Sequence, residues 1–122
     1  MKDNKKFWGK LASIDLHGCN DHIKHPEKIK EFIIKLCKEI NMERHGEVLI
    51  DSFGEGKLWG YSCMQFIETS SITCHFDHQM SETNRAFIDI FSCMDFDENK
   101  AAKFCKRFFS ASDLKLTTLI RN

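Results

Sequence analysis

Hydrophobic and polar residues alternate along the chain with two periods, which predict strands and helices. Residues 11–16 alternate with a period of two, the pattern of a strand that buries one face, and Gly18 closes this segment. Pro26 suits the first turn of a helix, where its missing N–H is harmless. The apolar residues that follow it fall on one helical face, with Lys and Glu on the other, and predict an amphipathic helix. These apolar residues are Ile29, Phe32, Ile33, Leu36, Cys37 and Ile40.

The rest of the chain contains further predicted strands and a second predicted helix. The strands are expected at residues 47–53, 58–68, 71–78, 85–93 and 113–120. Gly54 and Gly56 supply a turn after the first of these, the polar residues 68–71 separate two others, and residues 79–84 form a polar loop. Asp97 is placed to cap the second helix. The inward stripe of that helix is Ala101, Phe104, Cys105 and Phe108.

The order of these elements, β-α-β-β-β-β-α-β, determines the expected fold class. Several strands are joined by turns too short for parallel crossovers, so they must pair antiparallel. The two amphipathic helices can then cover one face of the sheet. We therefore expect an α+β fold, a two-layer sandwich of an antiparallel β-sheet with two helices on one face. The length suits one core, so residues 1–122 are expected to form one domain.

Composition and charge narrow the classes of function. The formal net charge is zero, so the chain lacks the electrostatic footprint of a protein that binds nucleic acid or a membrane surface. Its apolar runs are far shorter than the roughly 20 residues that span a bilayer, and its polar start lacks the apolar region of a signal peptide. We therefore expect a cytoplasmic protein. In the reducing cytosol its six cysteines should be free thiols, and most of them should lie in the core. No two cysteines have C-x-x-C spacing, so no metal site is expected.

Four residues are candidates for chemistry: Ser62, Ser70, His75 and Cys93. Each alone has an ordinary structural explanation, as a strand serine, a turn serine, a hydrogen-bonded strand histidine and a core thiol. Their spacing is more informative than their identity. Eight positions after Ser62 the chain reads S-S-I-T-C-H over residues 70–75, and then D-I-F-S-C over residues 89–93.

This pattern resembles the short prokaryotic form of S-adenosylmethionine decarboxylase, a pyruvoyl-dependent enzyme that is made as a proenzyme. The segment G-K-L-A-S-I-D-L-H-G-C over residues 9–19 is similar to the opening strand of that family, and the resemblance covers nearly the whole chain. It implies decarboxylation of S-adenosylmethionine, which supplies the aminopropyl donor for spermidine biosynthesis. It also implies a homodimer.

The resemblance further implies that the chain makes its own cofactor by cutting itself between Thr69 and Ser70. The Ser70 hydroxyl attacks the Thr69 carbonyl, and elimination leaves a pyruvoyl group that forms a Schiff base with the substrate amine and serves as an electron sink. In this scheme His75 is the processing base, Ser62 helps to hold the processing intermediate, and Cys93 is the proton donor for turnover. Because Ser70 and His75 point to opposite faces of a regular strand, we expect a turn or bulge to bring them together.

The sequence departs from the family pattern beside the cleavage serine and in the loop that follows. Thr69 and Ser71 stand where the family has Glu and His, so the cut is expected to be slower or to draw on their hydroxyls. Glu82 falls where the family has an acid that binds the ribose hydroxyls; it is a candidate for the same work, the alternative being a solvated loop carboxylate. Phe53 and Trp59 could stack on an adenine, although core packing is the more ordinary use of both.

Two other functions are compatible with these departures. If the site no longer holds adenosine, a basic amino acid is favoured, and the chain is a pyruvoyl-dependent ornithine or arginine decarboxylase. If the chain never cuts itself, it is a non-catalytic homologue that acts as a binding or regulatory subunit. Release of CO2 from each substrate separates the two enzymatic functions, and the intact mass of the purified chain tests the third.

Overall fold

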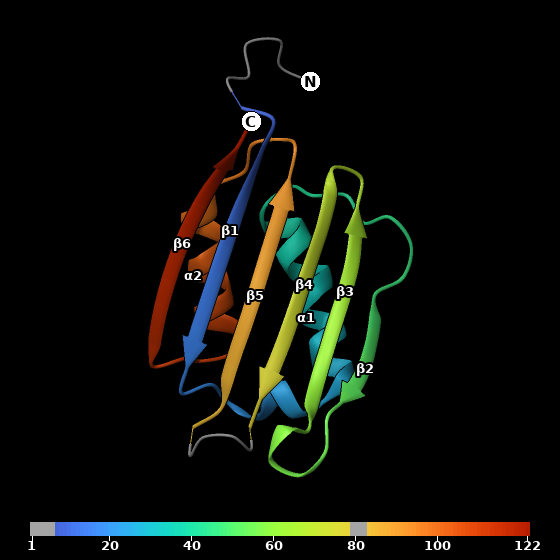
Figure 1. Cartoon of the computed structure of the whole chain (residues 1–122), viewed down its shortest axis with the longest axis vertical. Helices are drawn as coiled ribbons and strands as arrows, with labels where there is room; N and C mark the ends of the chain where they lie inside the picture. Colours follow the sequence, from blue (N-terminus) through green and yellow to red (C-terminus); the bar gives the residue numbers. More distant parts are fainter. Residues whose placement is uncertain (1–6, 79–82) are drawn as a thin grey trace.

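The computed structural model describes residues 7–78 and 83–122, and its main feature is a six-stranded sheet with helices on one face (Figure 1). The strands lie in the order β2-β3-β4-β5-β1-β6, and each neighbouring pair is antiparallel. The elements in chain order are β1 (Gly9–His17), the 3-10 helix η1 (Asp21–Lys24), α1 (Pro26–Glu39), β2 (Leu49–Phe53), the 3-10 helix η2 (Gly56–Leu58), β3 (Gly60–Ile67), β4 (Ser70–Asp77), β5 (Arg85–Ser92), α2 (Glu98–Phe108) and β6 (Asp113–Arg121). The α+β sandwich expected from the sequence is confirmed.

Local sequence explains where the two helices begin. α1 starts at the chain's one proline, and α2 follows Asp97, whose side chain accepts a hydrogen bond from the Lys100 N–H at 3.0 Å as an N-cap. The two 3-10 helices were not predicted, and η2 takes Leu58 out of the strand expected there. The expected polar turn is also shorter, because Ser70 already opens β4. Within the described ranges, no helix has the length and apolar character needed to cross a membrane.

The hydrophobic core lies between the helices and the sheet. Side chains alternate along the central strands, so Ile14, Ile72 and Ile88 face the helices and are fully buried. α1 packs Phe32 into the same core, and Phe109 follows α2 with its ring centroid 4.7 Å from that of Phe32. Burying a side chain of this size contributes about 1.5–3 kcal/mol each. This packing fixes the sheet and therefore the ends of its strands.

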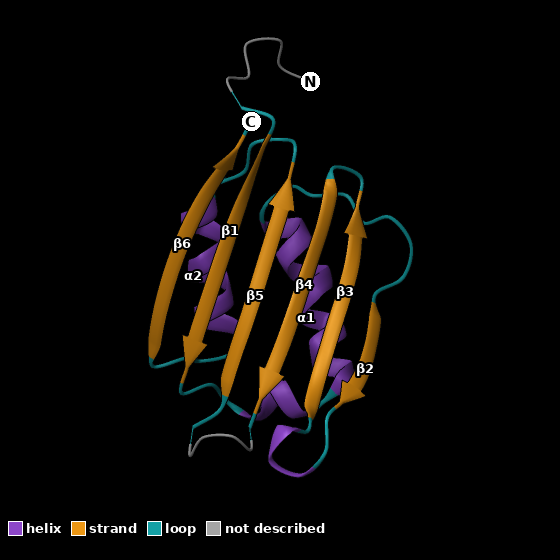
Figure 2. Ribbon diagram, viewed as in Figure 1, coloured by secondary structure: helices purple, strands orange, loops and turns teal. Residues whose placement is uncertain are grey.

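The other face of the sheet, which we call the open face, is not covered by the helices (Figure 2). By register, Phe66, Phe91 and Leu119 occupy one row across it. Phe66 is 54% exposed and Leu119 is 51% exposed. Trp8, just before β1, is also exposed and stacks on Phe91 with ring centroids 5.9 Å apart. Large apolar side chains exposed together on a sheet are typical of a surface that associates with another molecule.

Candidate active site

Ser70 lies at a tight turn and has an unusual backbone conformation. β3 ends at Ile67 and β4 begins at Ser70, so only Glu68 and Thr69 form the turn. Ser70 has a φ of +154°. Residues other than glycine rarely adopt a positive φ of this kind, which costs about 1–3 kcal/mol. The strain therefore lies directly beside the Thr69–Ser70 peptide bond.

The end of β5 surrounds the Thr69 side of this bond. The backbone N–H of Cys93 donates to the Thr69 carbonyl oxygen at 3.0 Å. The hydroxyl oxygens of Thr69 and Ser92 are 2.8 Å apart, and Ser92 is fully buried. Ser70 and Ser92 are direct partners in the β4–β5 register. The fold thus brings together Thr69, Ser70, Ser92 and Cys93, which we call the cleavage cluster.

Lys10 fastens the loop that follows Cys93. Its side chain is only 8% exposed, and its Nζ lies 2.7 Å from Asp95 Oδ1 and 3.1 Å from Glu98 Oε2. It also donates to the carbonyl of Phe96 at 2.6 Å. Burial by itself lowers the pKa of the ammonium, but the hydrogen bonds to Asp95 and Glu98 outweigh it and raise the pKa above its ordinary value. The charged lysine thus holds this loop against the start of β1.

The segment after α1 holds the turn that precedes Ser70. The Glu68 N–H donates to the Glu43 carbonyl at 2.9 Å, and the Glu68 carboxylate lies 2.7 Å from His45 Nδ1. Gln65 of β3 is fully buried, and its side-chain oxygen accepts from Arg44 Nε at 3.0 Å. The Thr69–Ser70 bond is therefore held between two segments that are distant in sequence, one after α1 and one after β5.

Ser62 and His75 meet on the open face. They are direct partners in the β3–β4 register, and Ser62 Oγ lies 2.8 Å from His75 Nδ1. The pair lines a hollow of about 280 Å³ together with Phe53 and Phe87, among others. An imidazole with a hydroxyl partner can take up a proton and release it again. The fold therefore brings Ser62 and His75 together as a hydroxyl–imidazole pair.

Within one chain this pair lies far from the cleavage cluster. Ser70 and His75 are five positions apart on β4, and the strand stays regularly paired with β3 and β5 between them. At about 3.3 Å per residue, roughly 16 Å of strand separates them. The expectation that a turn or bulge near Ser70 brings the two residues together is therefore wrong within one chain: the turn lies before Ser70, and hydrogen bonds to strands on both sides keep β4 extended.

The residues expected to bind adenosine lie in different surroundings. Phe53 is 59% exposed at the end of β2 and lines the hollow beside the serine–histidine pair, so the expectation of core packing is wrong for this ring. Trp59 packs edge-to-face on Tyr61, with ring centroids 5.0 Å apart. Glu82 lies outside the described residues.

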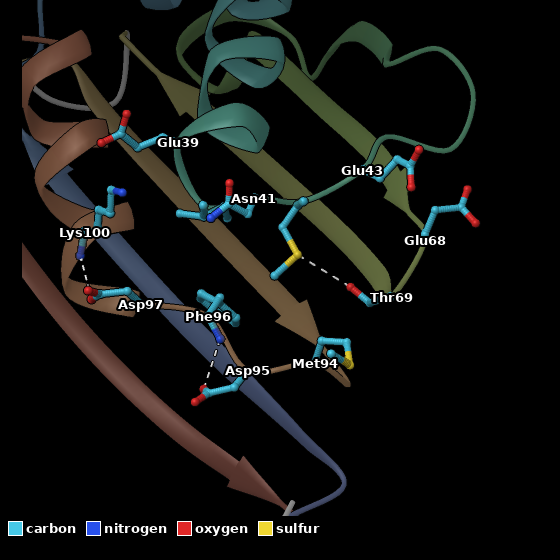
Figure 3. Close-up of a pocket in the computed structure, with 12 residues that line it drawn as sticks. Glu39, Asn41, Glu43, Glu68, Thr69, Met94, Asp95, Phe96, Asp97 and Lys100 are labelled. Atoms are coloured by element: carbon cyan, nitrogen blue, oxygen red, sulfur yellow. Dashed lines mark hydrogen bonds between the residues drawn. The ribbon is translucent and has the colours of Figure 1, made fainter. Parts of the chain in front are cut away.

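A second hollow, of about 470 Å³, opens beside Thr69 between the end of α1 and the start of α2 (Figure 3). Its lining residues include five carboxylates and one lysine, Lys100. The carboxylates belong to Glu39, Glu43, Glu68, Asp95 and Asp97. An excess of negative charge in a hollow attracts cations. Sequence reasoning missed this hollow, because its carboxylates come from separate segments that only the fold brings together.

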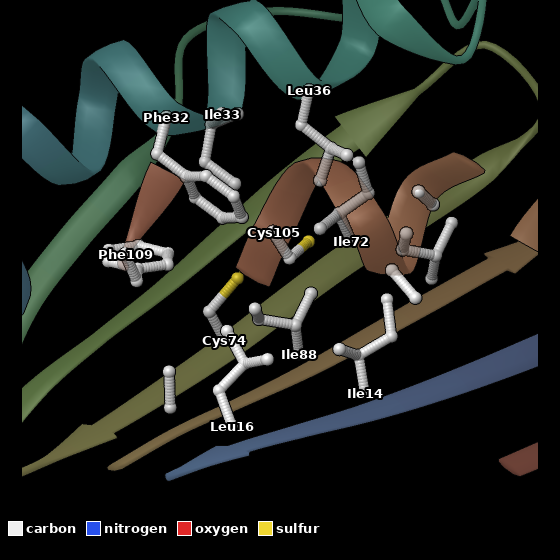
Figure 4. Packing of buried hydrophobic residues seen from close by; sticks show 14 of the residues in the cluster. Ile14, Leu16, Phe32, Ile33, Leu36, Ile72, Cys74, Ile88, Cys105 and Phe109 are labelled. Carbon is white, nitrogen blue, oxygen red and sulfur yellow. The ribbon is translucent and has the colours of Figure 1, made fainter. Parts of the chain in front are cut away.

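Among the cysteines, Cys93 is the one beside the Thr69–Ser70 bond. Burial raises the pKa of both Cys19 and Cys37 to about 11. Burial also raises the pKa of Cys74 and of Cys105, which lie among the apolar side chains between the helices and the sheet (Figure 4). These four thiols therefore stay protonated at neutral pH, as expected for core residues. Cys93 is only half-buried.

Comparisons with known proteins identify the family and the fold. The family model for S-adenosylmethionine decarboxylase matches residues 10–122. Among solved structures, the chain is similar to the adenosylmethionine decarboxylase from Aquifex aeolicus, with a TM-score of 0.78 and 19% sequence identity over 97% of this chain and 93% of that one. At this identity the structural likeness shows the fold alone. A search of curated proteins found no match.

Proposed function

The chain belongs to the S-adenosylmethionine decarboxylase family, a family of carboxy-lyases, and on this basis we propose that it activates itself by cutting the Thr69–Ser70 bond. The product is a pyruvoyl-dependent S-adenosylmethionine decarboxylase that works in the cytoplasm and supplies the aminopropyl donor for spermidine. One observation carries the proposal: the Thr69 carbonyl accepts the Cys93 N–H at 3.0 Å directly beside a strained Ser70.

The cleavage cluster fits the formation of a pyruvoyl group from Ser70. Ser70 Oγ attacks the Thr69 carbonyl carbon, the C–N bond breaks, and the hydroxyl proton passes to the Ser70 nitrogen, which leaves an ester. The Cys93 N–H stabilises the charge that develops on the carbonyl oxygen, and breaking the bond relieves the backbone strain. A base then removes the Ser70 Cα proton and the Cβ–Oγ bond breaks, freeing the Thr69 carboxylate. One water replaces one ammonia at residue 70 to leave the ketone.

We propose that this base is His75 of a second subunit, because His75 of the same subunit is out of reach. Two copies can pack open face against open face about a two-fold axis that lies between the sheets, perpendicular to the strands. Their β4 strands then run in opposite directions, so the Ser62–His75 pair of each copy lies toward the Thr69–Ser70 end of β4 in the other. The exposed side chains of Phe66 and Leu119 support this packing, since it buries both.

The same arrangement supplies groups for decarboxylation. A pyruvoyl group at residue 70 would supply an electron sink for the loss of CO2 from a substrate bound through its amine. Cys93 lies beside residue 70 and delivers a proton to the substrate α-carbon after CO2 leaves. Phe53 offers an exposed ring to the adenine from the hollow that it shares with His75, and Glu82 offers a carboxylate to the ribose.

Denaturing mass spectrometry of the purified protein tests self-cleavage directly. The expected result is two chains, residues 1–69 and residues 70–122, with a ketone at the start of the second. Sodium borohydride, which reduces ketones, should raise the mass of the second chain only. A single intact chain would contradict the proposed enzyme and favour a non-catalytic binding subunit.

Mixed dimers test whether two subunits share the site. Ser70→Ala and His75→Ala should each remain uncut when expressed alone. When the two are expressed together under different tags, the His75→Ala chain keeps its Ser70 and faces His75 of the Ser70→Ala subunit, so it should be cut. Two tagged copies of His75→Ala are the matched control and should stay intact. Cutting of His75→Ala alone would remove His75 from the mechanism, and uncut mixed dimers would contradict the shared site.

A basic amino acid is the second candidate substrate, since its cationic side chain suits the acidic hollow beside Thr69. S-adenosylmethionine is also a cation, through its sulfonium, so the hollow is compatible with both. Release of labelled CO2 from S-adenosylmethionine, ornithine and arginine separates them. Turnover of ornithine or arginine with none of S-adenosylmethionine would overturn the first choice of substrate.

A further inference from the structure

Ser92 lies at the centre of the cleavage cluster, although its side chain does not contact the reacting carbonyl. Its Oγ accepts the Met94 N–H at 3.0 Å and lies 2.8 Å from Thr69 Oγ1. We propose that Ser92 is a positioning residue for self-cleavage: it holds Thr69 so that the Thr69 carbonyl stays hydrogen-bonded to the Cys93 N–H. This inference rests on the proposed function, because it concerns the same bond.

The strain at Ser70 explains why such a residue is needed. A residue with a φ of +154° can relax by rotation of the peptide group that precedes it. That rotation turns the Thr69 carbonyl away from the Cys93 N–H and breaks the backbone hydrogen bond that anchors this carbonyl oxygen. The Thr69 side chain provides a second anchor, because its hydroxyl is bonded to Ser92. The strained state is therefore held from two directions.

The hydroxyls of this second anchor belong to a continuous chain of hydrogen bonds. Ser92 Oγ accepts from the Met94 N–H, and when the Thr69 hydrogen points to Met42 Sδ, the Ser92 hydroxyl is the donor to Thr69 Oγ1. The Thr69 hydroxyl in turn donates to Met42 Sδ at 3.6 Å. The chain links the loop after β5, the β3–β4 turn and the segment after α1. Ser92 is fully buried, so removing its hydroxyl takes from Thr69 Oγ1 the partner that holds it in place.

The chain also bears on the departure from the family pattern at residue 69. Thr69 has no carboxylate to offer, and its hydroxyl is committed to Ser92 and Met42. Its contribution to the cut is therefore geometric, through the orientation of its own carbonyl. Removal of either hydroxyl, by Ser92→Ala or Thr69→Val, should leave the fold intact but release that orientation.

The rate of self-cleavage tests the inference. Wild type and variants are made by cell-free synthesis, quenched at timed intervals, and the cut fraction is read by denaturing mass spectrometry. Ser92→Ala should slow the cut on the order of 10-fold to 100-fold, the factor expected for a lost buried hydrogen bond. Thr69→Val should slow it similarly, and the double variant should be no slower than the slower single variant. Ser92→Thr, which keeps the hydroxyl, should cut close to the wild-type rate.

Ser112→Ala is the matched control. Like Ser92→Ala, it removes one hydrogen-bonded serine hydroxyl. The Ser112 hydroxyl donates to the His17 carbonyl at 3.2 Å, at the end of β1 that lies far from the cleavage cluster. It should cut at the wild-type rate. Melting temperatures are recorded for every variant, and a variant that loses thermal stability yet cuts at the wild-type rate shows a structural role alone, which overturns the inference.

The remaining outcomes are equally decisive. If Ser92→Ala cuts as fast as wild type, or if Ser92→Thr is as slow as Ser92→Ala, the hydroxyl does not position the bond. If the effects of the two single variants multiply in the double variant, the two hydroxyls act separately and the proposed pair is wrong. A wild-type chain that never cuts overturns the proposed function, and this inference with it. A wild-type chain that cuts normally, with no response to Ser92→Ala, overturns the inference alone.

Discussion

The strain at Ser70 leads to a reversal in the usual order of stability between alanine and glycine. Ser70→Ala and Ser70→Gly both lack the hydroxyl, so both should remain uncut and can be compared as intact chains. Inside an ordinary strand, glycine is less stable than alanine by about 0.5–1 kcal/mol, because it loses more backbone entropy on folding. At a φ of +154°, however, alanine keeps the strain of about 1–3 kcal/mol and glycine is free of it.

The net effect favours glycine by about 1 kcal/mol, the difference between the midpoints of these two ranges. For a chain of this length, it corresponds to a melting temperature about 3–6 °C higher for Ser70→Gly. Urea unfolding gives the free energy directly, at one fixed protein concentration because the protein is proposed to be a dimer.

The neighbouring residue supplies the control. Ser71 lies in β4 but is not among the described residues with positive φ. Ser71→Ala should therefore be more stable than Ser71→Gly, which is the ordinary order. If alanine is the more stable substitution at both positions, Ser70 carries no strain, and the argument that strain assists the cut is refuted.

Two further predictions concern turnover and pH. Cys93→Ala should still be cut, since its backbone N–H remains, but release of CO2 should fall by about 10²-fold to 10⁴-fold; unchanged turnover would remove the thiol from the mechanism. The pKa of Lys10 is raised in the folded protein, so its contribution to stability is complete below the ordinary value of 10.5 and is lost as the pH rises through the folded pKa. Urea unfolding between about pH 9 and pH 12 should therefore show a steeper alkaline loss for wild type than for Lys10→Met, and parallel curves would contradict the ion pairs assigned to Asp95 and Glu98.

Much of the candidate site could have been placed from the sequence by hairpin register alone. Once the turn is limited to Glu68 and Thr69, antiparallel pairing sets Ser62 opposite His75, and alternation puts both on one face. The burial of Lys10 could also have been predicted, because it lies two positions before Ala12. Alternation along the strand therefore puts both side chains on the face that packs against the core. The signal was missed because a lysine near the start of a strand is usually exposed.

The sequence by itself determined the periods of the elements, the proline that starts α1, the aspartate that caps α2, and the spacing that identifies the family. Periodicity and capping are local properties that a few neighbouring residues fix. Only the tertiary structure decided that β5 ends against the Thr69 carbonyl, that Ser92 reaches the Thr69 hydroxyl, and that Ser70 and His75 stand apart. These features depend on which strands pair and on the core that holds them, and a strand hydrogen-bonded on both sides cannot bend to satisfy a spacing in the sequence.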